Sequence, residues 1–294
     1  MNTFIIRISL GCAAVFFSAF FSAVFYSTAL AATVAPDLSE ATFSNPTDIT
    51  HPFFSLPVGK EMRFEGETED GLETVEISIP GDTREILGVE TLVYRDKVWV
   101  DGEFVEDTFD YLAQDDEGNV WYFGEDVDNY EDGVVADHDG SWIAGVDGAE
   151  AGYWMPAVSK HAVGYSYREE HYEGEAEDEA EIVSVTESVD VEYGSFSDCI
   201  QTKNTTPLDP SVLEYKYYCE GAGGLTLETK PDENVRVELT DVEMEDADDD
   251  DDGDGEDDDT DDDDDDAEGV EALEKLQMRL IELLQKLIKL LTNS

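Results

Sequence analysis

The feature that most constrains this chain is an acidic tract near its C-terminus, from Asp248 to Asp266. Between Asp241 and Glu268, 21 of 28 residues are acidic. Like charges repel one another and the tract offers almost no apolar side chain to bury, so it cannot fold alone. It therefore predicts a disordered Asp-rich linker over residues 243–268. The linker separates a globular region, residues 51–242, from a C-terminal helix, residues 269–292.

The charge of the chain limits its partners. The sequence has 74 Asp and Glu against 16 Lys and Arg, a formal net charge of -58. Binding of nucleic acid needs Lys and Arg to replace counterions, so nucleic acid is excluded as a partner and dissolved cations are expected. Residues 33–240 alone contain 50 acidic and 11 basic residues. This acidity indicates either adaptation to high salt or calcium sites between strands, and the sequence leaves both open.

The N-terminus predicts a signal peptide over residues 1–31. Arg7 supplies the positive start, an apolar run follows from Leu10 to Phe25, and Ala29-Leu30-Ala31 predicts cleavage before Ala32. No other apolar run reaches the roughly 18 residues that a membrane-spanning helix needs. The mature protein is therefore expected to be secreted or periplasmic, without a transmembrane span; a retained N-terminal membrane anchor is the alternative.

Two cysteines remain after the predicted cleavage, Cys199 and Cys219. An even pair in an exported chain predicts a disulfide, and two buried thiols are the alternative. Their spacing is not the CxxC of a redox or zinc site.

The region from His51 to Val242 has the pattern of an all-β domain, preceded by an extended lead-in over residues 32–50. Short β-rich segments alternate with turn signals, which predicts an antiparallel sandwich or open barrel. The expected strands are 74–79, 91–94 with 98–100, 119–123, 180–185, 212–218 and 235–239, with turns at 101–102, 116–119 and 221–224. Aromatic side chains on these strands predict either core packing or the wall of a ligand cleft.

The region from Glu65 to about Leu239 resembles a family of exported bacterial β-rich proteins of unknown activity. The longest motif is residues 106–126, which contain the run AQDDEGNVWYFGED. Shorter matching segments are 52–59, 140–148, 165–168, 174–178, 206–210 and 216–218. The resemblance implies export and a sheet-rich domain, and it implies no activity.

The acidic tract contains two registers of a calcium loop, with oxygen ligands at alternate positions and a Gly for the turn. The candidate metal ligands are Asp248, Asp250, Asp252, Asp254, Asp258 and Asp261. The second register is similar to the aspartate-rich calcium repeats of thrombospondin-like secreted proteins. A run of Asp broken by Gly also produces such spacing by chance, so weak and diffuse cation binding is the alternative.

The C-terminal segment has leucines at alternating steps of three and four, typical of a coiled coil. They are Leu273, Leu276, Leu280, Leu283, Leu287 and Leu290. A lone helix cannot bury this face, so residues 270–291 are expected to form a homo-oligomer. Docking on the β-domain and contact with a membrane surface are the alternatives.

No motif of a known catalytic site is present: GxSxG, HExxH, GxxxxGK[ST] and GxGxxG after a strand are all lacking. The sequence therefore favours a non-enzymatic binding or structural protein of the envelope or exterior that associates with calcium. The alternatives are a carrier of an apolar ligand in a curved sheet and a hydrolase with an unrecognised carboxylate site. Convergent carboxylates with raised pKa values in a cleft would favour the hydrolase.

Overall fold

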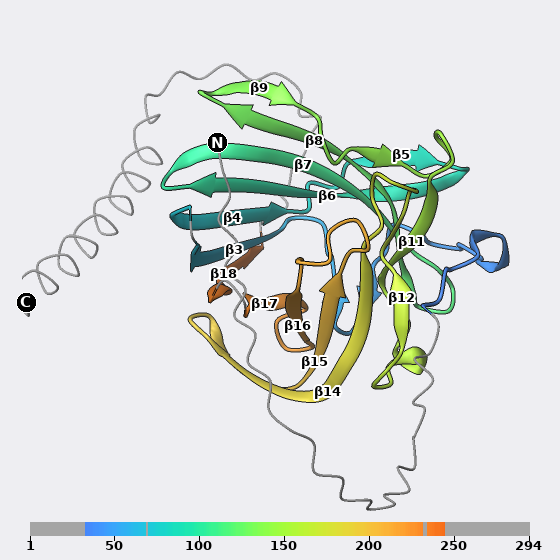
Figure 1. Ribbon diagram of the computed structural model, residues 1–294. Coiled ribbons are helices and arrows are strands. Elements are labelled where there is room, and N and C mark those ends of the chain that lie inside the picture. Colours follow the sequence, from blue (N-terminus) through green and yellow to red (C-terminus); the bar gives the residue numbers. More distant parts are fainter. Residues whose placement is uncertain (1–32, 69, 232–233, 245–294) are drawn as a thin grey trace, which may run out of the picture. The chain divides into compact units, whose positions relative to one another are not determined.

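The computed structural model describes residues 33–68, 70–231 and 234–244 (Figure 1). The predicted signal peptide, most of the acidic linker with its calcium-ligand candidates, and the C-terminal helix lie outside the described residues. The described part is almost entirely β-structure, with two short 3-10 helices, η1 (Leu38–Glu40) and η2 (Val158–Lys160). The strands are β1 (Thr50–His51), β2 (Phe54–Ser55), β3 (Lys60–Glu67), β4 (Leu72–Ser78), β5 (Thr83–Ile86), β6 (Val89–Val100), β7 (Glu103–Gln114), β8 (Val120–Glu131), β9 (Val134–Asp137), β10 (Trp142–Ile143), β11 (Glu150–Met155), β12 (Ser166–Arg168), β13 (Glu170–His171), β14 (Glu179–Val191), β15 (Gly194–Thr205), β16 (Glu214–Cys219), β17 (Gly224–Lys230) and β18 (Val235–Met244).

One antiparallel sheet winds round on itself to form a nearly closed, barrel-like structure. Its strand order is β12-β14-β15-β16-β17-β18-β3-β4-β6-β7-β8-β11-β13. Figure 1 shows the curvature, with β6 to β8 on one side and β14 to β16 facing them from the other. The all-β prediction is therefore confirmed, and of the two expected architectures the structure has the barrel.

The sheet closes through a single bent segment of chain. β12 and β13 are the two ends of the strand order, and only Glu169 separates them in the sequence. The first half of this segment pairs with β14 and the second half with β11. Gly152 of β11 permits the close approach, because a Cβ there would lie 2.1 Å from the carbonyl oxygen of Glu169.

The strands follow from the alternation of their side chains. In β3, Lys60, Met62 and Phe64 are buried, whereas Glu61 and Arg63 are exposed. The β6–β7 hairpin turns at Asp101 and Gly102, whose φ values of 50° and 81° suit a two-residue turn of type I′. The strands expected from sequence each overlap a strand of the structure, and the expected turns are present. The longer strands β3, β7, β11, β15 and β17 were not expected, and in β7 and β15 acidic and polar side chains occupy many of the positions.

A small hairpin and the N-terminal segment fill one end of the barrel-like sheet. Phe54 of β2 is fully buried, and Lys60 Nζ donates hydrogen bonds to the carbonyl oxygens of Ser55 and Gly223 at 3.0 and 2.8 Å. The segment expected as an extended lead-in is packed rather than free. Its Phe43 contacts the Trp121 ring at a centroid distance of 6.2 Å.

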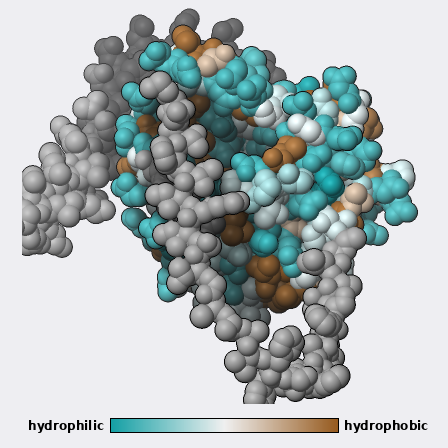
Figure 2. Space-filling view, in the orientation of Figure 1, coloured by the Kyte–Doolittle hydropathy of each residue, from teal (hydrophilic) through white to brown (hydrophobic). Residues whose placement is uncertain are grey.

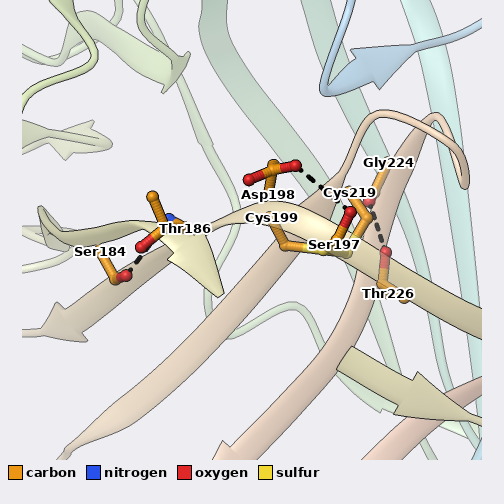
Figure 3. The surroundings of a disulfide bond; sticks show 8 residues. All are labelled: Ser184, Thr186, Ser197, Asp198, Cys199, Cys219, Gly224 and Thr226. Atoms are coloured by element: carbon orange, nitrogen blue, oxygen red, sulfur yellow. Dashed lines mark hydrogen bonds between the residues drawn. A yellow bond between two sulfur atoms is a disulfide. The ribbon is translucent and has the colours of Figure 1, made fainter. Parts of the chain in front are cut away.

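A disulfide joins Cys199 of β15 to Cys219 of β16, with an S–S distance of 2.05 Å (Figure 3). The two strands are neighbours in the sheet, and both cysteines are fully buried. This agrees with the pair predicted from sequence, and an oxidised pair is consistent with an exported protein.

The outer surface is polar. Figure 2 shows a face that is mainly hydrophilic, with scattered hydrophobic residues. No helix among the described residues is long and apolar enough to cross a membrane.

Candidate functional site

The interior of the barrel-like sheet contains a polar cavity of about 180 Å³. Seven carboxylates and one ammonium group line it, together with three aromatic rings and a threonine. The lining residues are Asp96, Glu106, Thr108, Asp110, Tyr122, Glu125, Trp154, Glu169, Glu170, Asp178, Lys216 and Tyr218. No single stretch of sequence supplies this set, because the residues come from strands on every side of the barrel.

Two structural devices bring these side chains inward. On β7, Glu106, Thr108 and Asp110 lie at alternate positions and therefore share one face of the strand. On the segment that closes the sheet, Glu169 and Glu170 are adjacent, yet both line the cavity. The bend at this point permits it: the backbone N–H groups of both residues donate to the carbonyl oxygen of Asp178, at 2.8 and 3.1 Å.

The carboxylates of β6, β7 and β8 are protonated more readily than exposed acids. Burial, followed by the charges of Asp110 and Glu170, raises the pKa of Glu125 to about 10. Burial raises the pKa of Asp110 to about 7, although a hydrogen bond of 2.6 Å from Tyr122 Oη opposes the shift. Burial and the neighbouring Asp110 raise the pKa of Asp96 well above its usual range. None of these three acids forms an ion pair with a Lys or Arg among the described residues, although the charge of Lys216 acts against the shift of Asp110.

The carboxylates of the closing segment are shifted in the same direction. Burial raises the pKa of Glu169 to about 7 and that of Glu170 to about 8, while the charge of Lys216 acts against both shifts. Glu169 also accepts a hydrogen bond of 2.6 Å from Asn204 Nδ2. Burial raises the pKa of Asp178, again against the charge of Lys216.

Lysines neutralise the opposite side of the interior. Lys216 Nζ lies 4.0 Å from Glu214, and Lys230 Nζ lies 3.0 Å from Glu214 and 3.7 Å from Glu228. Burial disfavours a charged Lys216, but the charges of Glu228, Glu169 and Glu214 raise its pKa well above the usual range. Lys216 is therefore an ammonium ion inside the barrel at neutral pH.

Aromatic rings form a connected group beside the carboxylates. The Trp154 ring contacts Tyr122, Tyr94 and Phe54 at centroid distances of 4.9, 5.4 and 5.5 Å. Phe54 also contacts Tyr218 at 6.3 Å. Aromatic side chains were expected either in the core or in the wall of a cleft, and the structure has both placements. Trp121 and Phe123 pack in the core, whereas Tyr122, Trp154 and Tyr218 line the cavity.

Two buried polar atoms on the cavity wall have no hydrogen-bond partner. They are Asp96 Oδ1 and Trp154 Nε1. An unpaired buried polar atom costs about 1–3 kcal/mol, so a group that enters the cavity and bonds with either atom gains from it.

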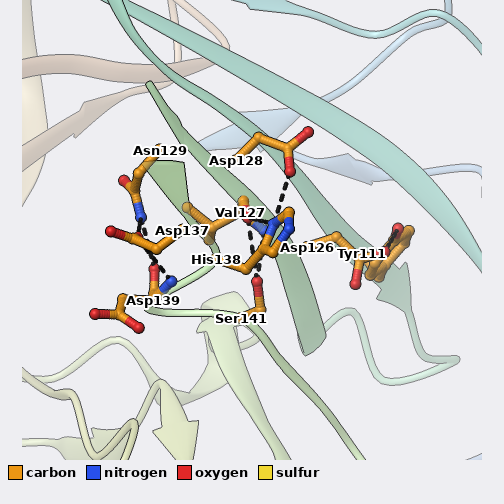
Figure 4. A network of polar contacts seen from close by, with 9 residues as sticks. All are labelled: Tyr111, Asp126, Val127, Asp128, Asn129, Asp137, His138, Asp139 and Ser141. Atoms are coloured by element: carbon orange, nitrogen blue, oxygen red, sulfur yellow. Dashed lines mark hydrogen bonds and ion pairs between the residues drawn. The ribbon is translucent and has the colours of Figure 1, made fainter. Parts of the chain in front are cut away.

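Acidic residues outside the cavity form ordinary surface contacts. In the network of Figure 4, Asp126 accepts a hydrogen bond from Tyr111 Oη at 2.7 Å and Asp137 accepts one from Asn129. His138 Nδ1 lies 2.8 Å from Asp128. Among the described residues, no three His, Cys, Asp or Glu side chains come together in a way that could hold a metal ion. The metal ligands expected at Asp248, Asp250, Asp252, Asp254, Asp258 and Asp261 lie outside the described residues.

The residues of this cavity were not predicted from the sequence, because 74 acidic residues are spread along the chain and none of them stands out. The available signal was the position of particular charged residues within strands, such as Asp96 after the buried run of β6 and Lys216 between the tyrosines of β16. A charged residue at a position that faces inward indicates an interior polar site.

No protein-family model and no curated protein matches the chain. Among solved structures, one similar chain is described as a "putative lipoprotein" from Parabacteroides distasonis, crystallised at 2.70 Å resolution. The likeness has a TM-score of 0.34 and 12% sequence identity, and covers 69% of this chain and 100% of that chain. The resemblance of residues 106–126 to a family of exported bacterial proteins stays a prediction.

Proposed function

We propose that this protein is an exported, non-enzymatic binding protein whose barrel-like sheet encloses a site for a small cation. The observation that carries the proposal is the imbalance between acidic and basic groups in the cavity, where seven acidic side chains and one lysine form part of the wall. Among the described residues, Asp96, Asp110, Glu125 and Glu170 form no ion pair with a Lys or Arg. Such carboxylates must take up protons or bind a cation.

Calorimetric titration of the full mature chain tests the proposal. The titrants are Ca²⁺ and 1,4-diaminobutane, at fixed ionic strength and pH 7.5. The expected result is saturable binding of one cation per chain that is lost in the double variant Asp96→Asn/Glu125→Gln. The exposed double variant Glu85→Gln/Asp132→Asn removes the same charges from the surface and is the matched control. If the cavity variant and the exposed variant bind each cation with the same affinity, the cavity is not the cation-binding site.

Hydrolysis is a second candidate, because the cavity contains convergent carboxylates with raised pKa values, the feature expected of a hydrolase. Asp110 has a pKa raised to about 7, which suits a general acid near neutral pH, and other carboxylates face it. Against it, the cavity of about 180 Å³ is smaller than the roughly 300–1,000 Å³ of typical ligand pockets. Turnover of chromogenic glycosides or esters, abolished by Asp110→Asn, would establish this function in place of simple binding.

Association of calcium with the acidic tract is a separate part of the proposal. It rests on the spacing of Asp residues between 248 and 261. If the cavity variant still releases or absorbs heat on calcium binding, and this heat is lost when residues 245–294 are deleted, then calcium binds to the C-terminal part. A carrier of an apolar ligand finds no support in this cavity, because carboxylates form most of its wall.

A further inference from the structure

The protein's own lysines indicate what kind of cation the interior accepts. Lys216 and Lys230 each place an alkyl chain along the inside of the sheet and an ammonium group among carboxylates. The acids around Lys216 include Glu169, Glu214 and Glu228, supplied by three different strands or bends. One side of the interior is thus neutralised by covalently attached alkylammonium groups.

The other side has carboxylates of the same kind without a lysine. Asp96, Asp110 and Glu125 stand on the adjacent strands β6, β7 and β8, and none of them forms an ion pair among the described residues. Two arginines nearby in the sheet pair with other acids: Arg95 of β6 pairs with Asp107 at 2.7 Å, and Arg84 of β5 pairs with Asp126 at 2.6 Å. These carboxylates therefore keep their protons unless a cation from outside the chain takes the place of the protons.

The wall beside these carboxylates is aromatic. Trp154 and Tyr122 lie 4.9 Å apart between ring centroids and both line the cavity, as does Tyr218. Aromatic faces attract ammonium groups electrostatically and bury methylene groups, and tryptophan does so best. These aromatic rings supply no oxygen ligands for a metal ion, whereas they can contact the methylene and ammonium groups of an alkylammonium compound.

Size and geometry also favour an organic cation over a metal ion. Within the described part of the chain no side chains are grouped as metal ligands. The cavity volume of about 180 Å³ lies below the roughly 300–1,000 Å³ of typical ligand pockets, which favours a small ligand. A short aliphatic amine is a ligand of this kind.

We propose that the ligand of this cavity is a short aliphatic diamine, with one ammonium group between Asp96, Asp110 and Glu125 and its methylene groups against Trp154. This inference rests on the proposed cation-binding function and narrows it to one chemical class. The second ammonium group is held by Glu170 and Asp178, which line the same cavity. Lys216, which already occupies the adjoining side, limits the length of the chain that fits.

The test compares 1,4-diaminobutane with 1,4-butanediol, Ca²⁺ and Mg²⁺ in calorimetry on the full mature chain. Diaminobutane should bind one per chain, whereas the uncharged diol of equal length should not bind. Asp96→Asn/Glu125→Gln should weaken diamine binding at least tenfold, and Glu85→Gln/Asp132→Asn should leave it unchanged. If a metal ion binds in the cavity but the diamine does not, this inference is wrong and the proposed cation-binding function still holds. Absence of any cation binding sensitive to the cavity variant would overturn both.

A second measurement on the unaltered protein covers the case in which the cavity variant does not fold. Diamine binding is compared at pH 8 and pH 5.5. In the cavity, protons compete for Asp96, Asp110, Glu125, Glu169, Glu170 and Asp178, so the affinity should fall at least tenfold at the lower pH. Equal affinity at both pH values would indicate exposed acids of ordinary pKa and would overturn the inference.

Discussion

At the scale of single residues, the interior carboxylates couple the stability of the fold to pH. Folding raises the pKa of Glu125 from 4.5 to about 10 and that of Asp110 from 3.8 to about 7. Between the unfolded and folded values the folded state binds more protons than the unfolded state. The free energy of unfolding therefore falls as pH rises through this window, which is opposite to the behaviour of acids held in salt bridges.

The variant Glu125→Gln tests this coupling. Gln resembles the protonated Glu, so it removes the cost of keeping a proton on the side chain at higher pH. The variant should gain stability relative to the original protein at pH 8, by on the order of 2 kcal/mol more than at pH 5. Urea unfolding at the two pH values measures the difference, with the exposed Glu85→Gln as control. Parallel stability curves for the original protein and the Glu125→Gln variant would contradict it.

At the scale of elements, closure of the sheet depends on the contact between β11 and the segment from β12 to β13. Gly152 has the carbonyl oxygen of Glu169 within 2.1 Å of the position that a Cβ would occupy. The same contact holds Glu169 and Glu170 at the cavity, so the fold and the candidate site share one structural requirement. Any side chain at position 152 must push the closing segment away.

The variant Gly152→Ala is accordingly expected to destabilise the protein by about 3 kcal/mol or more, because the clash is with backbone and cannot be relieved by a rotamer change. Thermal unfolding followed by circular dichroism measures the loss. Gly194→Ala is the matched control: Gly194 also lies in a strand, but its added Cβ would meet only the Phe196 ring at 3.5 Å. Equal stability of the two variants would show that closure does not depend on Gly152.

At the scale of the whole molecule, charge and oligomeric state are separate questions. The acidic surface and the tract together give the chain its charge of -58. The leucine heptads of residues 270–291 predict association between copies through the C-terminal segment. Deletion of residues 269–294 should therefore reduce the mass measured by sedimentation equilibrium to that of a monomer, because the exposed apolar face is lost. If the deleted protein is still an oligomer, the copies associate through another surface. If the full chain is already a monomer, the prediction of association through residues 270–291 is wrong.

Local features of this protein can be predicted from the amino-acid sequence. Alternating strand patterns and turn signals such as Asp101-Gly102 predict the all-β class, because strand formation and tight turns depend on residues that are neighbours in the chain. Cys199 and Cys219 predict their disulfide because only two cysteines remain after the expected cleavage. In a chain with 74 acidic residues, however, composition cannot distinguish interior carboxylates from surface ones.

Which acids face inward depends on how the strands come together in three dimensions. Asp96, Asp110, Glu125 and Glu170 are separated by many residues in sequence, and they meet because β6, β7, β8 and β13 curve round one axis. Burial of a strand's face depends on how the sheet closes, and a one-residue change in register would turn these side chains outward. The raised pKa values, the cavity and the proposed site follow from that closure, since each depends on desolvation and on charges brought together from distant strands.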